Sequence, residues 1–567
     1  MCNLLKYKFS QLGFTGLNEN NAPSTASAIR NHKTFSFRYV TLKEILNVID
    51  KLNINKPLGP SNIPAWALKD GKMELAEPLC FLFNQFITEG IFPSSLKKAK
   101  VTPLYKKGCP EDPNNYRPIS VTGALAKIFE TLLRDQIDAF LLSNSLISNC
   151  QYGYKKKTST QDALLYCTEK IRTCIDTNQF VHGAFLDLSK AFDSLSHNIL
   201  LAKLKQIGFE NSAIQIIQSY LSNRQQVVTL GQIESDWIEV QRGVPQGTVL
   251  GPLLFSLYIN DLQNVLSSEC EIVQYADDTF IFCNDKDSGK AKQMLERFII
   301  NVIDYFEKHQ LVVNKDKTEY IIFSRNKSMT GQILDVNGEK VCSKDTVKYL
   351  GVYLDQHLSY DFEVKKLLKK MAAGIRVLYS IANCIPSKTR VLLINSLVLS
   401  HVHYSAMLLI GVKKSLLYTL EKQLNWAIKA SFHRKKFDHV TDLKINNEIF
   451  PISHLIEYRS LSYFIQSLRS ERPALIQRPL PTFCFKRNAR KKELVFNQKT
   501  KTKIMDKSFI KLAIDLYNNL PLETRSHIEN TNHCIKRTIK SIFWEKFLKD
   551  PSSAVPRVKL KDIKFLQ

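Results

Sequence analysis

The pattern of apolar and polar positions changes its period once along the chain. Up to about residue 355, short runs rich in β-branched and aromatic residues alternate with helical patterns. Residues 181–188 have the pattern of a buried strand, and residues 271–273 and 280–283 that of two strands joined by a tight turn. Other segments predict helices over 198–208 and 211–221 and a hairpin over 225–230 and 236–241. We therefore expect an α+β fold around a mainly antiparallel sheet.

The flanking regions have different patterns. Residues 1–40 are polar and Asn-rich, and we interpret them as a loose leader. A helix is expected from Thr41, because Thr41 and Glu44 have the spacing of a capping box. From residue 362 to about 470 the period is helical, and the first helix has an apolar face with a basic remainder. The apolar positions of that helix are Val364, Leu367, Leu368, Met371, Ile375 and Leu378.

The charge of the chain indicates a polyanionic partner. A hydrophobic content of 44% with 23% charged residues is typical of a globular protein, so the net charge of +26 does not reflect disorder. Such an excess of positive charge favours nucleic acid over a membrane surface. Residues 486–567 alone carry 20 Lys/Arg and 8 Asp/Glu, a net charge of +12, which predicts a small basic helical region that binds RNA or DNA.

The cysteines and the apolar segments bound the cellular setting. Twelve cysteines are scattered without a Cys-x-x-Cys pair, so we predict neither a zinc site nor a disulfide-built secreted fold. The N-terminus lacks the basic-then-apolar order of a signal peptide. Residues 391–412 are the most apolar long stretch, but they include Asn395, His401 and His403, which favour a buried helix over a membrane span. We expect a reduced intracellular protein that makes no membrane contact.

Three aspartates are candidates for a metal site. Asp277 and Asp278 stand between two apolar strands, and Asp187 stands where residues 181–188 turn towards a helix. Asp-Asp is also ordinary turn chemistry, and Asp187 is also a plausible helix cap. However, adjacent like charges beside apolar strands are costly unless a cation offsets them, and clustered carboxylates suit a divalent ion.

The order of three short motifs is more specific than any one of them. Asp187 with Phe192, then Pro245-Gln246-Gly247, then Tyr275-Ala276-Asp277-Asp278 resemble motifs A, B and C of reverse transcriptases. The stretch from about Thr41 to Asp355 resembles the reverse transcriptase of non-LTR (LINE-type) retrotransposons. The resemblance implies a right-hand polymerase with fingers, palm and thumb. The implied division is 1–40 leader, 41–96 N-terminal extension of the fingers, 97–355 fingers and palm, 356–475 helical thumb, and 476–567 basic C-terminal helices.

The resemblance also implies a site. Asp187, Asp277 and Asp278 would hold two Mg²⁺ ions, with the carbonyl of Leu188 completing the set, as in two-metal nucleotidyl transfer. Lys106 and Arg117 would bind the nucleotide triphosphate, and Lys317 would protonate the departing pyrophosphate. Phe192 would exclude a ribose 2′-hydroxyl, while Gln246 and Gly247 would contact the template and the nascent base pair. For Lys106 and Lys317 a solvated surface lysine, and for Phe192 a core phenylalanine, are the alternative interpretations.

The implied function is RNA-directed DNA synthesis with an RNA template, a DNA primer and dNTPs as partners. Forty leading residues are too few for an endonuclease domain, so we expect either a truncated open reading frame or a polymerase that uses a nick made by a separate endonuclease. We expect action in the nucleus. Two alternatives remain open at this point. One is an RNA-dependent RNA polymerase, which Asp193 favours, and the other is a catalytically silent RNA-binding remnant of a retroelement.

Overall fold

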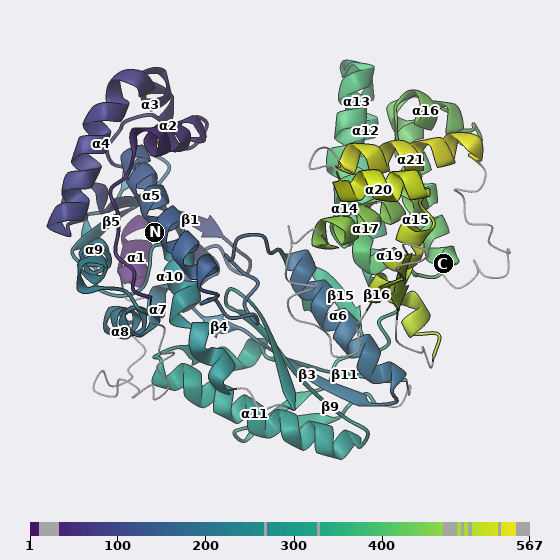
Figure 1. The fold of residues 1–567 in the computed structure, drawn as a ribbon, viewed down its shortest axis with the longest axis horizontal. Helices are drawn as coiled ribbons and strands as arrows, with labels where there is room; N and C mark the ends of the chain where they lie inside the picture. The colour runs from purple at the N-terminus through teal and green to yellow at the C-terminus, as the bar shows by residue number, and fades with distance from the viewer. Residues whose placement is uncertain are drawn as a thin grey trace.

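The computed structural model has two lobes that are joined below by a central sheet (Figure 1). It describes residues 1–10, 33–265, 269–325, 329–468, 485–488, 493–496, 502–530 and 535–551. The N-terminal lobe, purple to blue, holds the first five helices and a mixed sheet, and the C-terminal lobe, green to yellow, is almost entirely helical. The α+β fold predicted from the sequence is confirmed.

The central sheet is antiparallel, with the strand order β11-β3-β9-β8. Both of its faces are covered, which explains why its strands are continuously apolar. Phe280 and Phe282 of β9 belong to the cluster that contains α6, whereas Ile281 and Cys283 belong to the cluster that contains α11. The bounds are β3 (Phe180–Leu186), β8 (Cys270–Tyr275), β9 (Asp278–Asp285), β11 (Glu319–Phe323), α6 (Thr160–Asp176) and α11 (Ser288–Lys308).

Three short strand pairs extend this region. The first ties the end of β3 to the segment after α11, because β4 pairs with β10. The last is the hairpin that the alternating sequence around residues 347–355 predicts. Their bounds are β4 (Leu188–Ser189) with β10 (Val312–Val313), β12 (Ile333–Val336) with β13 (Glu339–Cys342), and β14 (Thr346–Tyr349) with β15 (Val352–Asp355).

The sheet of the N-terminal lobe has the order β2-β1-β5-β6, with β7 also paired to β5. The predicted hairpin over 225–241 is therefore present as β5, β6 and β7. Strand β1 pairs antiparallel with β2 and parallel with β5. The bounds are β1 (Lys98–Tyr105), β2 (Tyr116–Thr122), β5 (Arg224–Leu230), β6 (Ile233–Glu234) and β7 (Ile238–Val240).

Helices pack around this second sheet. The capping box at Thr41 is present, with Glu44 closing it, and the two predicted helices near residues 198 and 211 are α8 and α9. The helices of the lobe are α2 (Leu42–Asp50), α3 (Ala65–Asp70), α4 (Lys72–Glu89), η1 (Ser94–Leu96), η2 (Pro113–Asn115), α5 (Ala124–Ser143), α7 (Ala191–Ser194), α8 (His197–Ile207), α9 (Asn211–Leu221), α10 (Gly251–Tyr258) and η3 (Asn260–Val265).

The described part of the N-terminal leader is structured, which corrects the prediction of a loose segment. Residues Cys2–Ser10 form α1, and this helix buries Leu5 and Phe9 against Val101 and Val228 of the neighbouring sheet. Farther along, Phe35 packs between Phe140 and Phe209. The polar, Asn-rich composition of residues 1–40 as a whole hides the helical spacing of Cys2, Leu5 and Phe9, whose burial depends on a sheet that is distant in the sequence.

The C-terminal lobe is a helical bundle that shares one hydrophobic core with the central sheet. Helix α12 buries the predicted apolar positions Val364, Leu367, Met371 and Leu378. The bounds are α12 (Asp361–Ile381), η5 (Ala382–Cys384), α13 (Ser387–Leu393), the π-helical η6 (Ile394–Leu399), α14 (Ser400–Leu409), α15 (Lys414–Ser431), α16 (Thr441–Asn446), α17 (Ile452–Leu468), β16 (Phe485–Asn488), β17 (Glu493–Phe496), η7 (Met505–Lys507), α19 (Phe509–Asn518), α20 (Leu522–Asn530) and α21 (Ile535–Lys549).

Within the described residues, the basic C-terminal region does not stand apart as a domain of its own. Helices α19 and α21 both pack on α17, and Trp544 meets the ring of Phe450 at 5.3 Å. Buried Glu169 of α6 accepts from the backbone N–H of Phe509 at 2.9 Å and so caps α19. The predicted division at residue 476 therefore separates segments that share a core; the other predicted boundaries stay predictions.

One continuous helical stretch, Ser387–Leu409, is long and apolar enough to cross a membrane. It is made of α13, η6 and α14. Its buried side chains include Val398, Val402 and Ala406, and α14 packs on α6 and α17. These contacts are those of a core helix, in line with the interpretation of residues 391–412.

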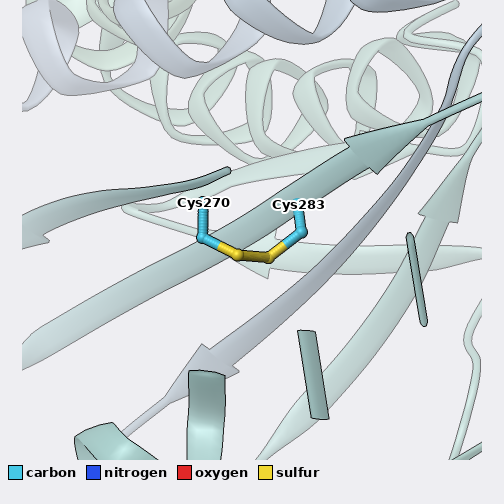
Figure 2. Close-up of a disulfide and its surroundings, with 2 residues drawn as sticks. All are labelled: Cys270 and Cys283. Carbon is cyan, nitrogen blue, oxygen red and sulfur yellow. A yellow bond between two sulfur atoms is a disulfide. The ribbon is translucent and has the colours of Figure 1, made fainter. Parts of the chain in front are cut away.

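A disulfide joins Cys270 and Cys283 across the β8–β9 hairpin (Figure 2). The two residues are register partners, with their Cα atoms 4.5 Å apart. This one disulfide departs from the expectation of a reduced protein, while eight other cysteines of the described residues are free. The pair is invisible in the sequence pattern, because the two residues are 13 positions apart and only the hairpin register places them opposite each other.

Candidate active site

Two strand ends of the central sheet bring the predicted carboxylates together. Asp187 directly follows β3, and Asp277 and Asp278 lie where β8 turns into β9. Leu186 is the register partner of Thr279, so Asp187 and Asp278 are the next residues outward on two neighbouring strands. The sheet therefore places all three carboxylates at the same end of its strands.

The Asp277 turn is held by a segment that precedes α6. Ala276 has a φ of +58°, and the side-chain oxygen of Gln151 accepts from its backbone N–H at 3.2 Å. The same oxygen accepts from Gly153 at 2.8 Å. A Cβ on Gly153 would lie 2.3 Å from the nitrogen of Ala276, so only glycine allows this approach. Gln151 is a functional residue that the sequence analysis missed, because nothing in the sequence links it to residues 276–278.

The aspartates are electrostatically unsatisfied. Burial raises the pKa of Asp277, the neighbouring Asp187 carboxylate raises it further, and Arg117 and Lys106 oppose the rise. The pKa of Asp278 is raised to about 6 by desolvation first and then by the charges of Asp277 and Asp187. Such a cluster favours a bound cation.

Lys317 provides one positive charge. It ends the short helix η4 (Lys315–Lys317), and its ammonium group forms an ion pair with Oδ2 of Asp187. The backbone supports this arrangement, since Asn314 N–H donates to the carbonyl of Asp187 at 2.8 Å and Val313 pairs with Leu188. The predicted general acid and the predicted metal ligand are therefore direct neighbours.

The donor set fits a magnesium site, although the side chains have not gathered around one. Among the described residues, no three His, Cys, Asp or Glu side chains are already arranged to hold a metal ion. The Lys317 ammonium group forms an ion pair with Asp187. The unsatisfied negative charge on Asp277 and Asp278 and the all-oxygen donors are what Mg²⁺ requires.

A basic wall faces the carboxylates across a cavity of about 560 Å³. Lys106 and Arg117 come from the β1–β2 hairpin, where Leu104 is opposite Arg117 and Lys106 N–H donates to the carbonyl of Asn115 at 2.8 Å. Burial lowers the pKa of Lys106, Lys317 and Arg117 lower it further, and Asp187 and Asp277 raise it. The cavity is thus lined by cations on one side and carboxylates on the other.

Phe192 forms an aromatic side of the same cavity. Its ring is half-buried and stacks on Phe255 with centroids 4.6 Å apart. Tyr154 meets it edge-on at 6.0 Å. The ring is therefore partly in the core and partly facing the cavity, which combines the two interpretations that the sequence left open. No motif or spacing in the sequence connects Tyr154 with Phe192.

The predicted template loop is anchored to the β1–β2 hairpin and to Asp193. The carbonyl of Gln246 accepts from Ser120 N–H at 2.7 Å, and its side-chain amide donates to Asp193 Oδ2 at 2.9 Å. Gly247 has a φ of +113°, and a Cβ there would lie 2.6 Å from the carbonyl oxygen of Ser120. Burial raises the pKa of Asp193 to about 7. Gln246 and Gly247 both line the cavity.

All but one of the predicted site residues therefore line a single cavity. Asp278, whose register places it at the cavity's carboxylate edge, is the exception. The lining comprises Lys106, Arg117, Asp187, Leu188, Phe192, Gln246, Gly247, Asp277 and Lys317.

Comparison with known proteins agrees with this geometry. Residues 104–354 match the family model "Reverse transcriptase (RNA-dependent DNA polymerase)". The chain is 26% identical over 339 residues to the "Probable RNA-directed DNA polymerase from transposon BS" of Drosophila melanogaster, and 27% identical over 335 residues to the "RNA-directed DNA polymerase from mobile element jockey" of the same organism. Residues 104–354 are therefore similar to reverse transcriptase domains, and the relatives that match come from mobile elements.

The matches cover only part of this chain and only part of each relative. Each of these two matches covers 58% of the chain and only 37% and 36% of the respective relative, so the chain spans little more than a third of their length. The structure of apo telomerase from Candida Tropicalis matches 71% of the chain and 72% of the telomerase chain, at 12% identity and a TM-score of 0.37. In the reverse transcriptase domain the central sheet is the palm, and the β1–β2 hairpin belongs to the fingers.

Proposed function

We propose that this chain is an RNA-directed DNA polymerase that extends a DNA primer on an RNA template by nucleotidyl transfer. The observation that carries the proposal is the convergence of Asp187 with Asp277 and Asp278 opposite Lys106 and Arg117. Phosphoryl transfer needs negative charge neutralised on both sides of the transferred group, and little further protein chemistry.

Each residue has a specific task in this mechanism. Arg117 binds the triphosphate through its planar donor fork, and Lys106 adds a point charge. Asp187, Asp277, Asp278 and the carbonyl of Leu188 would hold two Mg²⁺ ions. When bound, these ions would activate the primer 3′-hydroxyl and neutralise phosphate charge. As the primer 3′-oxygen loses its proton to solvent and bonds to the α-phosphorus, the bond to pyrophosphate breaks and Lys317 gives a proton to the departing oxygen.

Lys317 must exchange partners before that step. In the structure its ammonium group is held by Asp187. To reach the departing oxygen, the ammonium group has to leave Oδ2 of Asp187, which would then be free to act as a metal ligand. The ion pair thus holds the ammonium group close to the site of the transfer.

The selection of deoxyribonucleotides rests on Phe192. Its ring is fixed by Phe255 beneath and by Tyr154 at its edge, so it has little room to yield to a ribose 2′-hydroxyl. Asp193 is the residue that favours the alternative of an RNA polymerase. Its carboxylate accepts a hydrogen bond from the side-chain amide of Gln246, which disfavours that alternative. The wider proposal includes a nuclear site of action and a separate endonuclease that supplies the primer end.

The deciding experiment is primer extension on an annealed RNA template with Mg²⁺ and either dNTPs or NTPs. Asp277→Ala is expected to reduce extension by about 10³-fold or more, because a central charge partner of the transition state is lost. Asp304→Ala, an exposed aspartate on α11, is the matched control and should extend at the wild-type rate. Equal extension by both variants would refute the assignment, and RNA binding without any extension by the wild type would support the silent remnant instead.

A further inference from the structure

The last turn of α1 reaches the active-site cavity. Lys8 and Phe9 line the cavity that also contains Asp187 and Asp277. Phe9 lines an adjoining cavity of about 280 Å³ as well, together with Pro245 and Gln246. The N-terminal helix therefore contributes to both spaces on either side of the loop that is proposed to contact the template.

The position of this turn is fixed by packing. Leu5 is fully buried and Phe9 is 5% exposed, in a cluster with Val101 and Val228. The thiol of Cys2 donates to the carbonyl of Val228 at 3.2 Å. Because the apolar side of the helix faces the β1–β5 sheet, the direction of Lys8 towards the cavity is determined by the fold.

Two lysines on this helix differ in their partners. Lys6 forms an ion pair with Asp236 at 2.9 Å. Lys8 has no ion pair with any carboxylate in the described part of the chain. Its charge instead repels that of Lys190, which lines the same cavity; burial and Lys8 lower the pKa of Lys190, and the Asp193 carboxylate raises it. Asp193 in turn holds the Gln246 side chain.

The partly buried Lys8 and the exposed Lys190 line one cavity, and two ammonium groups on one cavity wall favour a bound anion. The anions that a polymerase brings into such a space are the nucleotide triphosphate and the phosphodiesters of the template. The triphosphate is accounted for by Lys106 and Arg117 of the β1–β2 hairpin. Lys8 is instead on the helix turn whose other residue, Phe9, lies beside the Pro245–Gln246 loop, which is the template side.

We propose that Lys8 and Lys190 together bind a backbone phosphate of the template strand where it enters the active site. The inference rests on the proposed polymerase function and adds a residue of the N-terminal helix to the template path. It predicts that this contact is purely electrostatic and independent of base sequence.

The test compares Lys8→Gln with Lys6→Gln in the full chain. Binding of a fluorescent primer–RNA duplex is measured by anisotropy at several salt concentrations, once with a single-stranded 5′ template overhang and once blunt. Lys8→Gln should weaken binding of the overhang duplex about fivefold and reduce the slope of log K against log salt by about 0.7–0.9. Lys8→Gln and Lys6→Gln should bind the blunt duplex with equal affinity. Lys8→Arg should restore the wild-type values. Lys6→Gln should match the wild type, because an exposed ion pair contributes little.

Three outcomes would overturn the inference. The first is identical binding by Lys8→Gln and Lys6→Gln. The second is an equal loss of affinity of Lys8→Gln for blunt and overhang duplexes. The third is a raised KM for dNTP in Lys8→Gln with unchanged duplex affinity, which would place the triphosphate at Lys8. Because anisotropy needs no catalysis, these results are independent of whether Asp277→Ala abolishes extension.

Discussion

At the scale of single residues, the site depends on side chains whose positions are fixed by other side chains. Phe192 is held by Phe255 and Tyr154, and Gln246 by Asp193. Sequence motifs identified Phe192 and Gln246. They could not identify their partners, because a contact between residues tens of positions apart leaves no trace in a single sequence.

Replacing the gate ring should change sugar selection. Phe192→Val removes the part of the side chain that faces the cavity, so incorporation of ribonucleotides relative to deoxyribonucleotides should rise about 10-fold or more. Competition between dNTP and NTP in primer extension measures this ratio, with Phe255→Leu as a control that loosens the ring without removing it. Unchanged selectivity in Phe192→Val would show that the ring is only a core residue.

The carboxyl group of Asp193 should make stability depend on pH. Its folded-state pKa is about 7, well above the ordinary 3.8, so the folded state binds a proton that the unfolded state has lost. The stabilisation is fully present below pH 4 and is lost as the pH rises through 7. Asp193→Asn keeps an acceptor for Gln246 but cannot titrate, so its melting temperature should fall less than that of the wild type between pH 5 and pH 8. Parallel melting profiles would contradict this.

At the scale of elements, periodicity predicted what is locally determined. The buried strand before Asp187 and the hairpin around Asp277 were predicted because both faces of the palm are covered and the runs are continuously apolar. Helix α1 was missed because it is stabilised by a distant sheet. The disulfide was missed because Cys270 and Cys283 meet only through the strand register.

The loop after β7 should not tolerate a side chain at Gly247. A Cβ there meets the Ser120 carbonyl at 2.6 Å, and the φ of +113° is itself unfavourable for other residues. Gly247→Ala should destabilise the fold by about 2–4 kcal/mol and reduce extension, as seen by thermal unfolding and primer extension. Gly231→Ala is the control, because it also has a positive φ but no atom within 4 Å, and should cost about 1 kcal/mol. Equal effects would show that the approach to Ser120 is unimportant.

At the scale of the whole molecule, the C-terminal helices and the palm form one packed unit. Glu169 of α6 is 2% exposed and connects the two, since it accepts from Ser508 and from the backbone N–H groups of Phe509 and Ile510. Composition suggested a separate basic domain at the C-terminus, and it could not reveal this connection. Net charge describes the surface of a region and says nothing of what its apolar side packs against.

Removing the Glu169 connection should destabilise the whole protein. Glu169→Ala leaves the first N–H groups of α19 without an acceptor and the Arg172 charge without its neighbour. We expect a loss of about 3 kcal/mol in the free energy of unfolding. Glu457→Ala is the control, because it breaks an exposed ion pair between α17 and Lys546 and should cost less than about 1 kcal/mol. Chemical denaturation measures both, and similar losses would argue against the connection.

The β3–β9 ladder, finally, bears on how related chains diverge. The candidate metal-binding aspartates are aligned by main-chain pairing from Phe180 with Asp285 to Leu186 with Thr279. The register of main-chain pairing depends on how many residues separate the paired positions far more than on which residues they are. Substitutions in these strands can therefore accumulate while the spacing of the carboxylates is inherited unchanged, whereas a single-residue deletion would move a carboxylate by about 3.3 Å and to the other face. Relatives of this chain should consequently differ widely in residue identity and hardly at all in the length of these two strands.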